Sequence, residues 1–176
     1  MTDILKIAEL GNPVLRSPTI PVKNVHASSI QRLINNLIIT ATETNGVGIA
    51  APQVSESLQL FIVASRPNLR YPHAPTMKPT AMINPKIVTY SDEQEQDWEG
   101  CLSVPGIRGL VTRSKEVEVI YIDRYGAQQQ RTFDGFVARI IQHEYDHITG
   151  KVFLDRVESM LDIMSDAEYH ARMVCG

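Results

Sequence analysis

The chain has 176 residues, of which 43% are hydrophobic and 21% are charged, and its formal net charge is −3. This composition is typical of a soluble globular protein with one core, and we predict a single domain over residues 1–176. It excludes a strongly basic nucleic-acid-binding surface, and the sequence has neither a signal peptide nor a membrane span, so we expect a cytoplasmic protein.

The first third of the chain predicts one helix after an irregular start. Residues 4–7 are mostly apolar and predict a short edge strand, and residues 11–13 predict a turn. Ser28, with Gln31 three residues later, has the pattern of a capping box and marks the start of a helix. Apolar residues then recur at helical spacing and predict a core-facing helix that ends near residues 44–46. They are Ile30, Leu33, Ile34, Leu37, Ile38 and Ala41.

Residues 46–53 have the sequence GVGIAAPQ. The two glycines resemble part of a phosphate-binding loop, but the third glycine and the Gly-Lys pair of such loops are missing. Small residues ending in Gln53 suit a backbone that runs close to a substrate. A tight connection without such a function explains the spacing equally well.

The remainder of the chain predicts several strands. Residues 58–63 and 81–89 are strand candidates, the latter interrupted by Pro85, and the proline-rich residues 66–80 predict an exposed loop. The acidic residues 91–97 predict a solvated turn. Residues 116–122 and 128–133 predict a hairpin, and residues 157–173 a long C-terminal helix. Strands joined by short turns indicate the α+β class rather than a parallel, doubly wound sheet.

His143, Glu144 and His147 form the pattern H-E-x-x-H. On a helix, positions i and i+4 share one face, so both imidazoles can reach one metal ion. Asp134 is the expected N-cap of this helix, and Gly150 is its expected C-terminal stop. We predict a catalytic metal site in which Glu144 takes a proton from metal-bound water.

A catalytic site of this kind takes three protein ligands, and the residues leave two candidates for the third. Glu168 lies at the spacing of a glutamate ligand on a later helix in one class of protease. Cys101 could bind as a thiolate, which suits zinc or ferrous iron. The histidine ligand of another protease class is excluded because Phe153 stands at its position. A purely structural metal site would leave Glu144 unexplained, and Cys175 is expected to have no role.

Gln142 and Asp146 flank the two histidines. We expect both to orient metal ligands or to pair with an arginine. For Asp146, a salt bridge to Arg139 on the same helix is an equally good interpretation.

Three stretches of the chain together resemble the peptide deformylase family. The family motifs G-x-G-x-A-A-x-Q, E-G-C-x-S and Q-H-E-x-D-H stand here as residues 46–53, 99–103 and 142–147, in the family's order. The flanking residues 11–16 and 135–139 also agree. The departures are small: Ile148 stands where leucine is usual, and the proline-rich loop is long.

The resemblance implies a metal-dependent hydrolase that removes the N-formyl group from the N-terminal formylmethionine of newly made polypeptides. It implies Cys101, His143 and His147 as ligands of Fe2+, for which Zn2+, Ni2+ or Co2+ can substitute. It assigns Gln53 and the backbone N–H of Leu102 to the formyl oxygen. The implied fold has antiparallel sheets packed around a central H-E-x-x-H helix, with an N-terminal and a C-terminal helix. The expected partners are N-formylmethionyl peptides of nascent chains, met at the ribosome.

The chemistry of these residue types agrees with that activity. Metal-bound water would attack the formyl carbon, and Glu144, as general acid/base, would carry its proton to the leaving amine. Further residues are expected to bind the peptide by backbone pairing, by close approach, or as walls of the methionine pocket. They are Val47 and Gly48 behind the peptide, Gly100 beside it, Ile140 in the pocket and Arg108 at its mouth.

Overall fold

The computed structural model describes residues 3–174, so Cys175 lies outside the described residues. The helices are α1 (Ser28–Glu43), α2 (Gly135–Ile148) and α3 (Asp166–Tyr169). The strands are β1 (Gly48–Ala50), β2 (Leu60–Val63), β3 (Thr80–Tyr90), β4 (Gln94–Cys101), β5 (Val104–Ser114), β6 (Glu116–Ile122), β7 (Gln128–Asp134) and β8 (Ile163–Ser165). Short helical turns are η1 (Pro13–Arg16), η2 (Ala51–Val54), η3 (Phe153–Arg156), η4 (Met160–Asp162) and η5 (His170–Val174). Within residues 3–174, no helix has the length and apolarity to cross a membrane.

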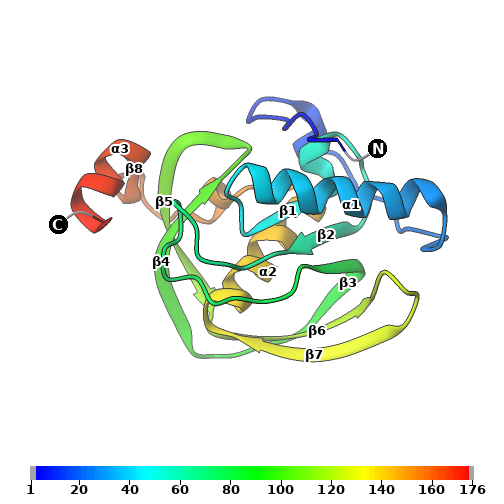
Figure 1. Cartoon of the computed structure of the whole chain (residues 1–176). Coiled ribbons are helices and arrows are strands. Elements are labelled where there is room, and N and C mark those ends of the chain that lie inside the picture. The colour runs from blue at the N-terminus through cyan, green and yellow to red at the C-terminus, as the bar shows by residue number, and fades with distance from the viewer. Residues whose placement is uncertain (1–2, 175–176) are drawn as a thin grey trace.

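The strands form two antiparallel sheets, as the α+β class predicts. One sheet has the order β1-β2-β3-β6-β7 and the other the order β4-β5-β8. Helix α2 contacts β1, β2, β6 and β7 of the first sheet and β5 of the second (Figure 1). Side chains on α2 therefore face strands of both sheets.

Helix α1 covers the β1–β2 end of the larger sheet (Figure 1). The predicted apolar face is confirmed, since Ile34, Leu37 and Ala41 are fully buried. The predicted capping box is wrong. Ala27 occupies the N-cap without a side-chain hydrogen bond, and Gln31 instead donates to the carbonyls of Val25 and Arg124, at 2.9 and 2.8 Å.

Strand β3 continues through Pro85 by means of an irregularity. The pairing with β6 shifts register between Ile83 and Lys86, and Asn84 has a φ of 49°. The Asn84 side chain bonds the backbone of Val22 twice, at 2.8 and 2.9 Å. A proline can occupy a strand at such a bulge because no ladder hydrogen bond is required of it there.

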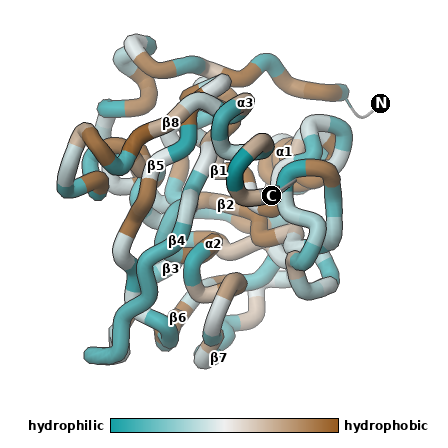
Figure 2. The backbone as a smooth tube through the Cα atoms, turned by 90° about the vertical axis from the view of Figure 1, so that its left-hand side faces the viewer, coloured by the Kyte–Doolittle hydropathy of each residue, from teal (hydrophilic) through white to brown (hydrophobic). Residues whose placement is uncertain are grey.

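Three predicted elements differ from the structure. Residues 4–7 form no strand, and residues 94–97, predicted as part of a turn, belong to β4, a largely hydrophilic strand paired with β5 (Figure 2). The long C-terminal helix is also wrong. Met160 and Leu161, which lie within its predicted range, are 82% and 92% exposed, and the chain instead adds β8 to the free edge of β5 before the short α3.

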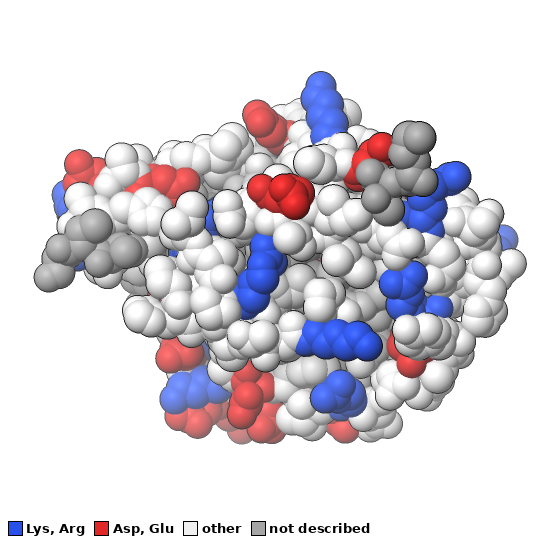
Figure 3. Space-filling model, in the orientation of Figure 1, with Lys and Arg blue, Asp and Glu red and all other residues white. Residues whose placement is uncertain are grey.

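Charges of both signs are spaced over the face of the molecule that carries α1 (Figure 3). Exposed ion pairs join Lys115 to Glu93 at 2.6 Å and Arg16 of η1 to Asp155 of η3. Exposed pairs of this kind contribute little to stability because water screens them.

Candidate active site

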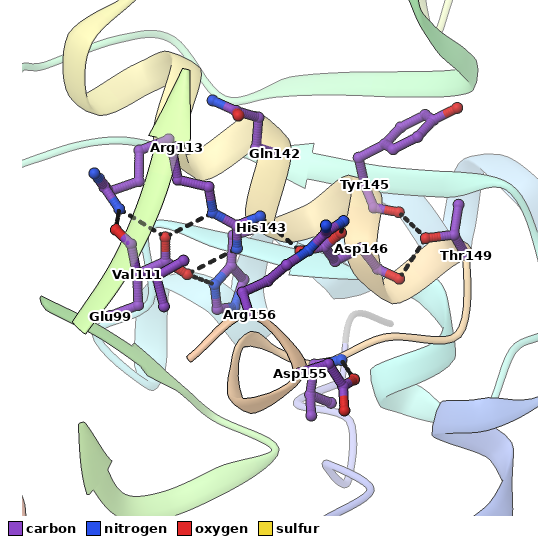
Figure 4. A network of polar contacts seen from close by, with 12 residues as sticks. Glu99, Val111, Arg113, Gln142, His143, Tyr145, Asp146, Thr149, Asp155 and Arg156 are labelled. Carbon is purple, nitrogen blue, oxygen red and sulfur yellow. Dashed lines mark hydrogen bonds and ion pairs between the residues drawn. The ribbon is translucent and has the colours of Figure 1, made fainter. Parts of the chain in front are cut away.

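Helix α2 carries the H-E-x-x-H residues, and one of them, His143, takes part in a network of polar contacts (Figure 4). Asp134 occupies the N-cap, as predicted, although its side chain makes no capping hydrogen bond. The helix ends at Ile148, and Gly150 follows with a φ of 76°, a conformation that glycine adopts without strain. His143 and His147 therefore lie one turn apart on the same face.

Cys101, His143 and His147 form the one group among residues 3–174 whose side chains could hold a metal ion. One donor atom from each lies within 4.8 Å of the others, and Cys101 Sγ is 3.3 Å from His147 Nε2. Glu168, the other candidate ligand, is exposed on α3 and accepts a hydrogen bond from Arg172 at 3.1 Å.

The donor set fits a divalent metal. Burial by itself raises the pKa of the Cys101 thiol, but the His147 and His143 imidazoles hold that pKa well below its usual range. Burial by itself lowers the pKa of His143, yet hydrogen bonds to Cys101 and Glu99 hold it well above its usual value. The pocket thus favours an anionic sulfur and a positive charge beside it. A thiolate with two imidazole nitrogens suits zinc or ferrous iron.

Gln53 on η2 is fixed beside Cys101. Its Oε1 accepts from the Ala50 N–H at 2.9 Å, and its Nε2 donates to Cys101 Sγ at 3.4 Å and to Ser103 Oγ at 3.1 Å. Because the acceptor end is held by the backbone, the donor end of the amide must face the sulfur. Leu102 follows Cys101 in the turn between β4 and β5.

Glu144 is 4% exposed, and its Oε2 has no hydrogen-bond partner among the described residues. Burial raises its pKa to about 7, although His143 and His147 oppose the shift. Gly48 on β1 makes this position possible, since a methyl group there would lie 2.9 Å from Glu144 Cδ. Glu144 is therefore a closely packed carboxyl poised to exchange a proton near neutral pH.

Glu99 on β4 orients His143. Its Oε2 lies 2.8 Å from His143 Nδ1, which leaves Nε2 of the ring to face the cavity. Arg113 donates to both Glu99 oxygens at 2.9 Å, and Arg139 donates to one of them at 3.0 Å. Burial would raise the pKa of Glu99, but Arg113 and His143 hold it well below its usual range. Glu99 therefore stays ionised.

The network continues outward through Asp146 (Figure 4). Asp146 accepts from Arg113 at 2.6 Å and from Arg156 at 3.1 and 2.6 Å, so it pairs with an arginine, as one interpretation predicted. The alternative partner, Arg139, instead pairs with Glu99. Gln142 joins α2 to β5, exchanging hydrogen bonds of 3.1 and 2.8 Å with the backbone of Ser114.

A cavity opens onto these groups. Residues expected at the site that line it are Val47, Gly48, Gln53, Gly100, Cys101, Leu102, Ile140, His143 and Glu144. Arg108 is not part of this lining, because its guanidinium lies behind Gly100 and is fully buried. Six lining residues were not predicted as site residues: Arg70, Tyr71, Trp98, Glu99, Phe136 and Arg139. Trp98 directly precedes the second motif, Glu99 is its first residue, and Phe136 and Arg139 lie in the flanking residues 135–139, and these positions are the only sequence signal that pointed to them.

Comparison with known proteins agrees with this geometry. The family model described as polypeptide deformylase matches residues 4–162. The chain belongs to the peptide deformylase family. It is 60% identical to peptide deformylase 2 of Nostoc sp. over 167 residues, which cover 95% of this chain and 93% of that one.

Solved structures of peptide deformylases share the fold. A Met-Ala-Ser-bound class I type b enzyme from Acinetobacter baumannii is 43% identical with a TM-score of 0.87, covering 89% of this chain and all of that one. A peptide deformylase from Synechococcus elongatus in complex with actinonin is 37% identical with a TM-score of 0.81, covering 92% of this chain and 84% of that one. At these identities the likeness extends beyond the fold to the family's sequence pattern.

Proposed function

We propose that this protein hydrolyses the N-formyl group from the N-terminal formylmethionine of newly made polypeptides, as one catalytic domain built around α2. The observation that carries this proposal is the group formed by Cys101, His143 and His147, next to a cavity that Cys101, His143, Glu144 and Gln53 line. Family membership supports the same reaction.

Cys101, His143 and His147 would hold the metal, with Fe2+ as the native ion. Family membership supports a catalytic metal, and the soft thiolate supports ferrous iron or an ion of similar preference, such as Zn2+, Ni2+ or Co2+. A bound divalent ion supplies a Lewis acid that makes coordinated water acidic near neutral pH. Glu99 keeps His143 in the orientation and tautomer that such an ion requires.

Glu144 is the proposed general acid/base. Its pKa of about 7 allows it to accept a proton at neutral pH and to release one to the leaving amine. Protonation of the amine is essential because an expelled amide anion would be too basic to leave. The Oε2 that lacks a protein partner is available for this transfer.

Gln53 and the Leu102 N–H are the proposed donors to the formyl oxygen. The carbonyl end of the Gln53 amide is anchored to the Ala50 N–H, and its Nε2 would exchange its bond to Cys101 Sγ or to Ser103 Oγ for one to the formyl oxygen, where it would stabilise developing negative charge. Cavity walls of Val47, Tyr71, Phe136 and Ile140 offer an apolar surface for the methionine side chain. The site would also favour a formyl over an acetyl group, because the acetyl methyl would have little space around the reacting carbon beside Gly48.

The substrates would be nascent chains in the cytoplasm, met as they leave the ribosome. The test is the release of free amine by protein purified anaerobically with Fe2+, measured side by side on formyl-Met-Ala-Ser, acetyl-Met-Ala-Ser and an internal peptide. We expect rapid hydrolysis of the formyl peptide alone. Comparable rates on the acetyl peptide, or cleavage of an internal bond, would contradict the proposal, and metal analysis of the same sample tests the choice of iron.

A further inference from the structure

Arg108 on β5 is the largest fully buried side chain of the described residues, and the catalytic groups do not use it. Its Nε donates to Asp166 Oδ1 at 2.6 Å, whereas Nη1 and Nη2 have no hydrogen-bond partner among residues 3–174. Burying a guanidinium with two unpaired nitrogens is costly. Asp166 compensates part of the charge, and the two unpaired nitrogens require a further favourable contact.

Two aromatic rings enclose the guanidinium. The Cζ of Arg108 lies 5.2 Å from the ring centroid of Tyr71 and 4.7 Å from that of Tyr169. The negative faces of aromatic rings attract a cation at such distances, and the attraction strengthens where water is excluded. Tyr71 comes from the proline-rich loop and Tyr169 from α3, so Arg108 joins two segments that are far apart in the sequence.

Asp166 and Tyr169 belong to a C-terminal segment, residues 163–174, that lies beyond the range matched by the family model, which ends at residue 162. Strand β8 attaches this segment to β5, with Met164 opposite Arg108 (Figure 1). Ser165 then caps α3 by accepting from the Glu168 N–H at 3.2 Å. The short α3 therefore places both Asp166 and Tyr169 against Arg108.

The clamped arginine lies directly behind the cavity wall. A methyl group on Gly100, which lines the cavity, would come within 2.9 Å of Arg108 Nε. Tyr71, also in the lining, donates to the Gly100 carbonyl at 3.4 Å. Trp98 of the same wall has its ring centroid 6.2 Å from that of Tyr169. Movement of Arg108 would therefore disturb three residues of the wall.

We propose that Asp166 and Tyr169 are positioning residues that lock Arg108 behind Gly100 and so fix the wall of the peptide-binding cavity. This inference rests on the proposed function, since the peptide it concerns is the formyl-methionyl substrate. The C-terminal segment thus shapes substrate affinity without touching the reacting atoms. Loss of the clamp leaves Arg108 free to move, and the peptide must then order the wall as it binds.

The test compares Asp166→Ala and Tyr169→Leu with wild type in the metal-loaded, full-length protein. We expect KM for formyl-Met-Ala-Ser to rise about 3- to 10-fold in each variant, the scale of one cation–π or ion-pair contact, with kcat little changed. Tyr169→Phe keeps the aromatic face and should restore wild-type KM. Arg172→Ala, on the exposed side of the same segment, should leave both constants unchanged.

A second measurement is independent of turnover. Trp98 is the only tryptophan of the chain and lines the cavity, so its fluorescence can report binding of the peptide Met-Ala-Ser. Asp166→Ala should weaken this binding by the same factor as it raises KM. Wild-type affinity and KM in both variants would overturn the clamp alone, whereas a wild-type protein inert toward the formyl peptide would overturn the proposed function and the clamp with it.

Discussion

A methyl group introduced at Gly48 tests how closely the structure holds Glu144. It would lie 2.9 Å from Glu144 Cδ and 2.9 Å from Ile140 Cγ2, whereas non-bonded carbons prefer about 3.5–4.0 Å. Glu144 would then shift by roughly 0.5–1 Å, the difference between these distances. A displacement of that size in a catalytic group can cost about 10²-fold in rate. Overpacking would also lower the free energy of unfolding by about 1–3 kcal/mol.

The assay for Gly48→Ala is formate release from formyl-Met-Ala-Ser, with metal content and Tm measured on the same samples. We expect kcat to fall by about 10- to 100-fold while the metal stays bound, because Glu144 moves and the ligands do not. Gly46→Ala is the matched control, since a methyl group there meets its nearest neighbours at 3.4 Å, an ordinary contact distance. A wild-type kcat in folded, metallated Gly48→Ala would refute the close packing of Glu144 as the basis of its role.

Four further predictions test other parts of the site and fold. Cys101→Ser should lose most of its metal because a hydroxyl is a poor substitute for a thiolate, whereas Glu168→Ala should keep it; the reverse result in metal analysis would favour a protease-type ligand set. Glu144→Ala should keep its metal but lose about 10²–10⁴-fold in kcat, and near-normal turnover would exclude a general acid/base role. Gln53→Leu should lower kcat by about 10²–10³-fold and, by orphaning the Ala50 N–H, lower the free energy of unfolding by about 1–3 kcal/mol; a change in KM alone would contradict transition-state stabilisation. Burial would raise the pKa of Asp155, but the hydrogen bond from Arg16 of η1 lowers it. The ion pair therefore stabilises the fold at pH values above the ordinary aspartate pKa, and this stabilisation is lost as the pH falls through the lowered pKa. Denaturant unfolding should therefore show Asp155→Asn less stable by up to about 1 kcal/mol at pH 7 and equal to wild type in strong acid.

Local rules explain which parts of the fold could be predicted. The apolar stripe of α1 and the spacing of His143 and His147 on α2 depend only on helical periodicity, and both helices occur at the expected positions. The strand pattern of residues 116–122 and 128–133 is equally local, and these residues form the β6–β7 hairpin. The chemistry of the side chains left Cys101 and Glu168 as two candidates for the third metal ligand. Only the family resemblance favoured Cys101.

Elements that depend on distant partners were predicted poorly. Residues 157–173 have apolar residues at helical spacing, but the free edge of β5 offers main-chain hydrogen bonds to residues 163–165, and the helix is shortened to α3. The polar residues 94–97 form a strand because β5 pairs with them along their length, and their own sequence carries no strand pattern. A pattern read within a window cannot detect a partner strand.

The charged network could not be derived for the same reason. Arg113 lies 14 residues from Glu99 and 33 from Asp146, so no periodicity links the three. Glu99 and Asp146 are both nearly fully buried, and buried carboxylates of this kind need cationic partners. The sequence predicted an arginine partner for Asp146 without identifying Arg113 or Arg156, and it predicted no partner for Glu99.

The two buried glutamates of the site show how the surroundings assign their roles. Glu99 and Glu144 are both 4% exposed, yet their pKa values shift in opposite directions. Burial raises the pKa of both, but Arg113 and His143 hold Glu99 ionised, whereas no arginine pairs with Glu144 among residues 3–174. Environments that shift the pKa values of two carboxyl groups in opposite directions leave one group permanently ionised and allow the other to exchange a proton. We therefore expect Glu99 to orient His143, and Glu144 rather than Glu99 to carry a proton near pH 7.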